Sequence, residues 1–226
     1  QITEKPNIIR EVTEILSPGT YLEEFNSDDN NYMMSIYIEK ISHWNAVGIS
    51  IIDISTGKNY IYQINENIDT NYWKDEISRL INYYSPKEFI FQTSKIILNE
   101  SDIRNYWNIQ NAIIRVNHYN SKIYENISYQ NELLQKVFNF ECEQTPIEEL
   151  DITYKYELCK SYIYLLQYIH EHKIDSLRNI NIPESINNIH TLSLTSNSSR
   201  QLNIVNNYSN YQGRYDSLFS ICNQCG

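Results

Sequence analysis

VGISIIDISTGKNYIY, at residues 47–62, is the densest run of β-branched and aromatic residues in the chain. Successive side chains of a strand point to opposite faces, so residues 47, 49 and 51 are expected on one face and residues 50, 52 and 54 on the other. Both sets are mostly apolar, which predicts a strand inside a sheet that is covered on both faces. Gly57 suits the positive φ of a tight turn, so residues 59–62 are expected to fold back antiparallel.

The composition predicts a folded protein without a broad surface for binding nucleic acid. Of the 226 residues, 41% are hydrophobic and 20 are tyrosine, which is enough for a core. A net charge of -10 argues against a broad phosphate-binding surface. Because no apolar run reaches membrane-spanning length and no signal peptide is visible, we expect an intracellular protein, without separating nucleus, organelle or viral replication compartment. The chain opens without Met and ends in mid-pattern at Gly226, so we expect it to be a piece of a longer protein.

Residues 28–145 are expected to form an α/β domain with a mixed sheet flanked by helices. A turn at residues 17–20 and an acidic linker at residues 23–31 precede it. Strands are predicted at residues 32–38, 47–54, 59–62, 88–91 and 112–116. Helices are predicted from Trp73 to Tyr84, after caps at Ser101 and Asp102, and after a cap at Ser128.

The pattern changes after Pro146, where we expect a helical segment at residues 146–226. A long helix is predicted to run to about Lys173, and its apolar stripe is expected to pack on helical neighbours. The stripe consists of Leu158, Tyr162, Leu165, Leu166 and Ile169. A strand at residues 190–195 and a helix at residues 199–208 are predicted beyond it. Together with a leading segment at residues 1–27, this gives three parts.

These segments, in this order, resemble the MutS family of DNA mismatch repair proteins. Residues 17–20, SPGT, resemble the motif that closes the family's mismatch-binding domain, and residues 52–57, IDISTG, resemble the LDISTG hairpin of its connector domain. Residues 165–168 fall where the family's core begins. Residues 192–204 resemble its "LD…TRRNLE" region, and residues 217–221 resemble the "SLL" run after it.

The resemblance implies that this chain transmits motion and carries out no chemistry of its own. It implies the end of a mismatch-binding domain (residues 1–27), an RNase H-like connector (28–145) and the start of a helical core (146–226). Full-length members are DNA-dependent ATPases, so ATP and Mg are expected in a missing ATPase domain, with no catalytic, cofactor or metal residues here. The implied partners are mismatched double-stranded DNA bound by other domains, a MutL-type protein, and a second subunit of a homo- or heterodimer.

An RNase H-like metal-dependent nuclease and a non-catalytic α/β interaction module are the alternatives. A nuclease of this fold would need several carboxylates around metal ions. Asp53, Glu88 and Asp102 are the candidates, although the commoner role for Asp53 is to accept hydrogen bonds from turn amides. Cleavage lost specifically in Asp53→Asn would favour the nuclease.

Four basic residues are the candidate DNA-phosphate contacts, although a surface salt bridge is the commoner role for each. They are Lys155, Lys160, Arg178 and Arg200. Cys222 and Cys225 have the spacing of half a zinc site or a redox pair, but two buried thiols are the expected outcome. His170 and His172 are two residues apart on a helix, so they are expected to be solvated and not to share a metal.

Four aromatic side chains could stack on bases as in single-strand binders, although their helical spacing favours the core. They are Trp73, Trp107, Tyr162 and Tyr168. The acidic pairs at residues 23–24 and 148–149 are interpreted as solvated faces, with a partner-docking surface as the alternative.

Overall fold

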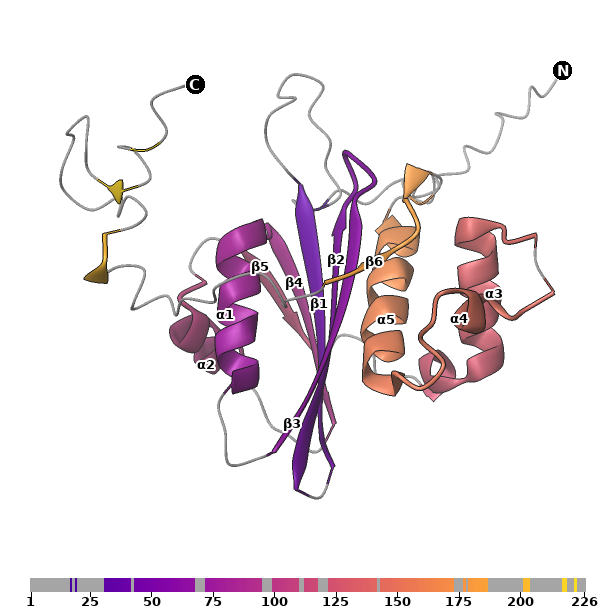
Figure 1. The fold of residues 1–226 in the computed structure, drawn as a ribbon, viewed down its shortest axis with the longest axis horizontal. Coiled ribbons are helices and arrows are strands. Elements are labelled where there is room, and N and C mark those ends of the chain that lie inside the picture. The colour runs from indigo at the N-terminus through magenta and orange to yellow at the C-terminus, as the bar shows by residue number, and fades with distance from the viewer. Residues whose placement is uncertain are drawn as a thin grey trace, which may run out of the picture.

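The run at residues 47–62 extends from β2 (Trp44–Asp53), an interior strand of a six-stranded sheet in the computed structural model, through a turn into the next strand (Figure 1). The structure describes residues 17, 19, 31–41, 43–67, 72–94, 99–109, 112–117, 122–141, 143–172, 177, 179–186, 201–203, 217–218 and 222. The strand order is β5-β4-β1-β2-β3-β6. The other strands are β1 (Tyr32–Ile41), β3 (Asn59–Asn67), β4 (Glu88–Ser94), β5 (Ile113–Val116) and β6 (Glu184–Ser185).

The sheet is mixed, as predicted. β1, β2 and β3 form an antiparallel meander, whereas β4 pairs parallel with β1 and β5 pairs parallel with β4. The turn between β2 and β3 contains Gly57 at φ 74°, which confirms the predicted positive φ. β2 begins three residues before the predicted start at residue 47, because Trp44, Asn45 and Ala46 already pair with β1 and β3.

The two faces of β2 enter two separate hydrophobic clusters, which confirms the predicted alternation. Val47, Ile49 and Ile51 join the cluster that includes residues of α1 (Tyr72–Tyr84) and α2 (Glu100–Trp107). Ile52 and Ile54 join the cluster built with α3 (Ile127–Phe138), α4 (Pro146–Glu149) and α5 (Tyr156–His172). Figure 1 shows α1 and α2 on one side of the sheet and α5, α3 and α4 on the other. The short 3-10 helix η1 (Lys122–Glu125) precedes α3.

The long helix α5 packs directly on the sheet. Its stripe lies in one hydrophobic cluster with residues of the sheet, of α3 and of α4, so the predicted helical neighbours are present and the sheet covers the helix as well. Residues 146–172 also share one cluster with Met33 and Ile90 of the sheet, so the predicted limit at residue 146 does not separate two packed bodies in the described residues. At Gly48 the helix backbone comes so close that a Cβ would overlap the carbonyl group of Glu157.

The helix starts differ from the predicted caps. Asn99 is the N-cap of α2, so Ser101 and Asp102 lie inside the first turn. Asn126 is the N-cap of α3, and its side chain accepts a hydrogen bond from the backbone N–H of Ser128, which is itself inside the helix. In both cases an Asn two residues before the predicted residue takes the cap position, but only Asn126 makes the side-chain hydrogen bond for which Asn is favoured there, because Asn99 makes no side-chain cap hydrogen bond.

No helix among the described residues is long and apolar enough to cross a membrane. The predicted acidic linker before residue 31, the strand at residues 190–195 and most of the helix at residues 199–208 lie outside the described residues.

Candidate functional site

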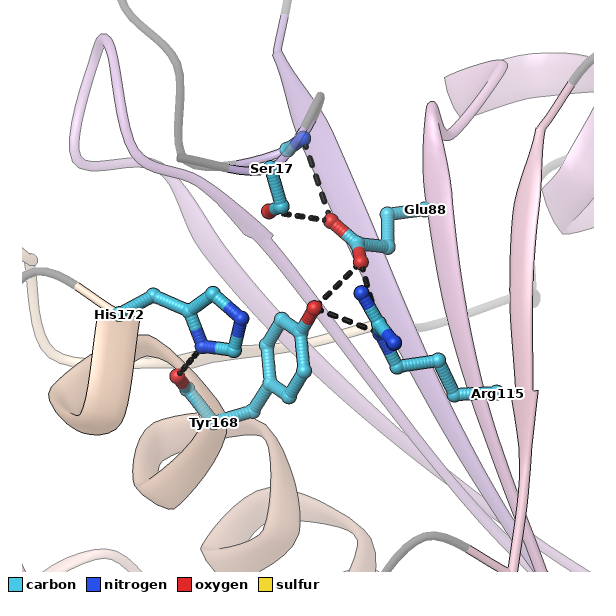
Figure 2. A network of polar contacts seen from close by, with 6 residues as sticks. Ser17, Glu88, Arg115, Tyr168 and His172 are labelled. Atoms are coloured by element: carbon cyan, nitrogen blue, oxygen red, sulfur yellow. Dashed lines mark hydrogen bonds and ion pairs between the residues drawn. The ribbon is translucent and has the colours of Figure 1, made fainter. Parts of the chain in front are cut away.

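Glu88, the first residue of β4, is a fully buried carboxylate at one end of the sheet. β4 runs between β1 and β5, where Glu88 pairs with Met33 and Ile113. A buried charge is costly unless hydrogen bonds and opposite charges satisfy it. The contacts of Glu88 therefore show which segments the fold brings together here, as Figure 2 shows.

One carboxylate oxygen of Glu88 binds the segment that precedes β1. Its Oε2 accepts from the hydroxyl of Ser17 at 2.6 Å and from the backbone N–H of Gly19 at 3.2 Å. Ser17 is buried, and a Cβ at Gly19 would press on the Met33 side chain. The carbonyl of Gly19 in turn accepts from the side-chain amide of Asn31 at 2.9 Å. These hydrogen bonds attach Ser17 and Gly19, called the SPG segment below, to the sheet.

The other oxygen of Glu88 binds α5 and β5. Its Oε1 accepts from the Tyr168 hydroxyl at 2.5 Å and from Arg115 Nε at 3.2 Å. Arg115 Nε also contacts the Tyr168 hydroxyl oxygen at 2.7 Å, so the three groups contact one another. Burial and the hydrogen bond to Glu88 raise the pKa of Tyr168, which keeps its phenol protonated as a donor. Burial lowers the pKa of Arg115, but Tyr168 and Glu88 more than offset this and raise it.

His172 extends these contacts to the end of α5. Its ring lies over the ring of Tyr168, with centroids 4.0 Å apart, and its Nδ1 is 2.8 Å from the Tyr168 carbonyl oxygen. The pairing with this carbonyl one turn earlier is typical of a histidine in the last turn of a helix. His172 therefore borders the buried network and is only partly exposed, while His170 is partly exposed as well.

Asp53 forms the turn between β2 and β3 and contacts the same upstream segment. Its carboxylate accepts from Ser55 N at 2.9 Å, from the Thr56 hydroxyl at 2.7 Å and from Asn31 N at 3.3 Å. Burial raises the pKa of Asp53, but these hydrogen bonds outweigh burial and bring it below the usual value. The interpretation of Asp53 as an acceptor for turn amides is confirmed.

Together these residues form one set, called the junction network below. Its members are Ser17, Gly19, Asn31, Asp53, Glu88, Arg115 and Tyr168. Asn31 links its two halves, because its backbone N–H binds Asp53 and its side chain binds Gly19. The network joins the SPG segment, the IDISTG turn, two parallel strands and α5 through hydrogen bonds.

The candidate nuclease carboxylates do not converge. Asp53 and Glu88 each hold a separate set of donors, and Asp102 is exposed on α2 near Asn99. Across the residues that the structure describes, no group of three or more His, Cys, Asp or Glu side chains could hold a metal ion.

The two described DNA-contact candidates are engaged with carboxylates. Lys155 pairs with Asp151 at 3.1 Å. Lys160 is partly buried, lies 3.5 Å from Glu39 and receives further contacts from Glu125 and the Tyr37 hydroxyl. Arg178 and Arg200 lie outside the described residues. Phosphate binding by these four residues stays a prediction.

The aromatic candidates are core residues, as their helical spacing favoured. Trp73, Trp107, Tyr162 and Tyr168 are all buried. Cys159 is buried and bonds to Gln130, whereas Cys222 is exposed, so the expectation that Cys222 is buried is wrong. Cys225 lies outside the described residues.

Sequence reasoning missed the roles of Arg115 and Tyr168. A single Arg in the short apolar strand at residues 113–116 was a usable signal, because a charge there requires a partner. A hydroxyl-bearing Tyr168 beside the apolar stripe of α5 was a second signal. Neither signal identifies Glu88 as the shared partner, because the three residues are far apart in the chain.

The comparisons with known proteins give one consistent family. The model of MutS domain II matches residues 31–181. A putative DNA mismatch repair protein, a mutS homolog of Acanthamoeba polyphaga mimivirus, is 30% identical over 258 residues, covering 99% of this chain and 23% of that protein. DNA mismatch repair protein MutS of Caldanaerobacter subterraneus is 30% identical over 216 residues, covering 94% of this chain and 22% of that protein. The chain thus spans less than a quarter of the length of these relatives.

A crystal structure of Fowlpox virus resolvase with Holliday junction DNA is similar at a TM-score of 0.37 and 15% identity, over 62% of this chain and 97% of that chain.

Proposed function

The chain belongs to the MutS family of DNA mismatch repair proteins, and on that premise we propose that it is the coupling part of a longer mismatch repair ATPase. Its sheet would receive the movement of a mismatch-binding domain that precedes it and pass this movement to a helical core and a distant ATPase domain. Rigid elements joined at a few contact points transmit rotation of one domain to the next.

The junction network is the observation that carries this proposal. Glu88 binds the SPG segment with one oxygen and α5 with the other, so a shift of the upstream segment changes the environment of Tyr168. Since all of these groups are buried or partly buried, breaking one hydrogen bond leaves its partner unsatisfied. The two ends of the module are therefore coupled through a single carboxylate.

We place the end of the coupling module after α5 and near residue 181. α5 packs on the sheet, and the family match runs to that residue. In this proposal residues 1–27 close the mismatch-binding domain, and the helical core begins later than residue 146.

The remaining parts of the proposal concern the whole protein. It would bind mismatched double-stranded DNA through other domains and hydrolyse ATP with Mg outside this segment. It would act inside the cell as a homo- or heterodimer and dock a MutL-type protein. Lys155, Lys160, Arg178 and Arg200 stay candidate phosphate contacts within this chain.

Tyr168→Phe in the full-length protein tests the coupling. The change removes only the hydroxyl that joins α5 to Glu88 and Arg115. We expect mismatch-containing DNA to stimulate ATP hydrolysis several-fold less than in the wild type, while hydrolysis without DNA and the affinity for mismatched DNA are unchanged. Steady-state ATPase rates and fluorescence anisotropy of labelled DNA measure these quantities.

Tyr129→Phe is the matched control. Tyr129 also donates to a group on α5, the Gln167 side chain at 2.6 Å, but this contact is outside the junction network. It should leave the stimulation intact. Equal stimulation in wild type and Tyr168→Phe would overturn the coupling role of the network, and equal loss in both variants would assign the effect to general loosening of α5.

A further inference from the structure

A groove of about 380 Å³ lies where η1, α3, α4 and the first turns of α5 meet. Its apolar walls come from Ile127, Ile147, Ile152 and Tyr156. Pockets that bind small ligands have volumes of roughly 300–1,000 Å³, so this groove has room for one or two side chains and not for a whole helix.

Apolar side chains are exposed at the mouth of the groove. Ile127 is 63% exposed and Tyr156 is 60% exposed, although both line the groove. Exposed apolar side chains that line a hollow are typical of an interaction site.

Hydrogen bonds between the elements hold the walls in place. The side-chain oxygen of Asn131 on α3 accepts from the backbone N–H of Ile147 on α4 at 3.1 Å. Gln130 on α3 and Cys159 on α5 are joined at 3.2 Å. α4 itself begins with a capping box between Thr145 and Glu148. A site with preformed walls binds a ligand with a smaller ordering cost.

The surroundings of the groove are acidic. The carboxylates of Glu125 and Glu148 line the groove, together with one cation, Lys160. Lys160 lies 3.5 Å from Glu39 and 3.4 Å from Glu125, so two carboxylates share one cation, and these three groups together with Glu148 carry a net charge of -2. An occupant with positive charge beside its apolar group is therefore favoured.

From these features we infer that the groove docks a short segment of a partner protein, in which a large apolar side chain is flanked by Lys or Arg. The apolar side chain fills the space between Ile147, Ile152 and Tyr156. The flanking cations face Glu125 and Glu148. This inference rests on the proposed partner docking and specifies its surface and chemistry.

Three synthetic peptides test the chemistry on the chain of residues 1–226. The first is a capped nine-residue peptide with a central Phe between Lys residues, the second replaces Phe by Ser, and the third replaces every Lys by Glu. Chemical-shift changes of the ¹⁵N-labelled chain give location and affinity. We expect the first peptide to shift amides around the groove and to bind at least tenfold more tightly than the other two.

Ile127→Ser and Ile182→Ser form a matched pair of variants. Both residues are more than half exposed, but only Ile127 lines the groove. Ile127→Ser should weaken binding of the first peptide at least fivefold and Ile182→Ser should not change it. Shifts elsewhere on the chain, equal binding of the acidic peptide, or no effect of Ile127→Ser would each overturn the inference.

Capture of a purified MutL-type protein from the same genome separates this inference from the proposed function. If wild type and Ile182→Ser capture it and Ile127→Ser does not, the groove is the docking site. Equal capture by all three keeps partner docking and overturns the groove. No capture by any of them overturns docking of this partner, while the peptide result still decides whether the groove binds basic, apolar segments.

Discussion

Glu88→Gln is the perturbation that most directly tests the junction network. Glutamine has the shape of glutamate, so it creates no cavity, but it has one acceptor oxygen and an NH₂ group that cannot accept. If the amide oxygen stays toward Tyr168 and Arg115, the NH₂ faces the Ser17 hydroxyl and the Gly19 N–H. The hydroxyl can rotate to accept, but the backbone N–H of Gly19 loses its acceptor.

The cost follows from this count of contacts. An unsatisfied buried donor costs about 1–3 kcal/mol, and a hydrogen bond to a charged group is worth about 1.5–3 kcal/mol against about 0.5–1.5 kcal/mol for a neutral one. Arg115 is 34% exposed, so water can solvate part of its charge and the loss of its counter-ion costs less than in a fully buried pair. We therefore expect Glu88→Gln to lower the free energy of unfolding by about 2–4 kcal/mol.

Urea unfolding followed by circular dichroism and tryptophan fluorescence measures this free energy. Glu100→Gln is the matched control, because Glu100 pairs with Arg104 at 2.7 Å on the exposed surface of α2. An exposed pair of this kind contributes about 0.3–0.5 kcal/mol. If Glu88→Gln lowers the free energy of unfolding no more than Glu100→Gln does, the network does not hold the SPG segment and α5 to the sheet. The proposed coupling through Glu88 would then be refuted.

Three further outcomes are expected from the described contacts. Gly48→Ala should lower the free energy of unfolding by about 1–3 kcal/mol or more in the same urea assay, because the new methyl group overlaps the Glu157 backbone. A wild-type free energy of unfolding would contradict the close approach of α5. Burial raises the pKa of the Cys159 thiol to about 12, so iodoacetamide at pH 8 should label exposed Cys222 in the folded chain much faster than it labels Cys159. Peptide mass spectrometry measures the two labelling rates, and equal rates would refute this expectation. The pKa of Asp53 is lower in the folded chain than in the unfolded chain, so this carboxylate stabilises the fold above its unfolded pKa, and the stabilisation is lost as the pH falls through its folded pKa. The free energy of unfolding, measured from about pH 5 to pH 2, should therefore fall more steeply in the wild type than in Asp53→Asn. Parallel curves would disprove the contribution.

The local pattern of the chain was sufficient to predict most of the sheet. The alternation of residues 47–54 predicted an interior strand covered on both faces, and Val47 and Ile52 do enter different hydrophobic clusters. Gly57 marked the turn because few other residues adopt positive φ at low cost. The helical stripe of α5 was likewise visible from its spacing. All three are properties of neighbouring residues, which a sequence displays directly.

Tertiary structure alone decided what those surfaces meet. The stripe of α5 is apolar whether it faces helices or a sheet, and only packing shows that Gly48 admits the helix onto β2. The junction network depends on contacts between Ser17 and Glu88, 71 residues apart, and between Glu88 and Tyr168, 80 residues apart. Periodicity specifies which face of an element is apolar, but a buried carboxylate is satisfied by whichever donors the completed fold brings to it. The sequence by itself therefore determined the strands of the sheet and the family, and the structure determined that Glu88 binds both Ser17 and Tyr168.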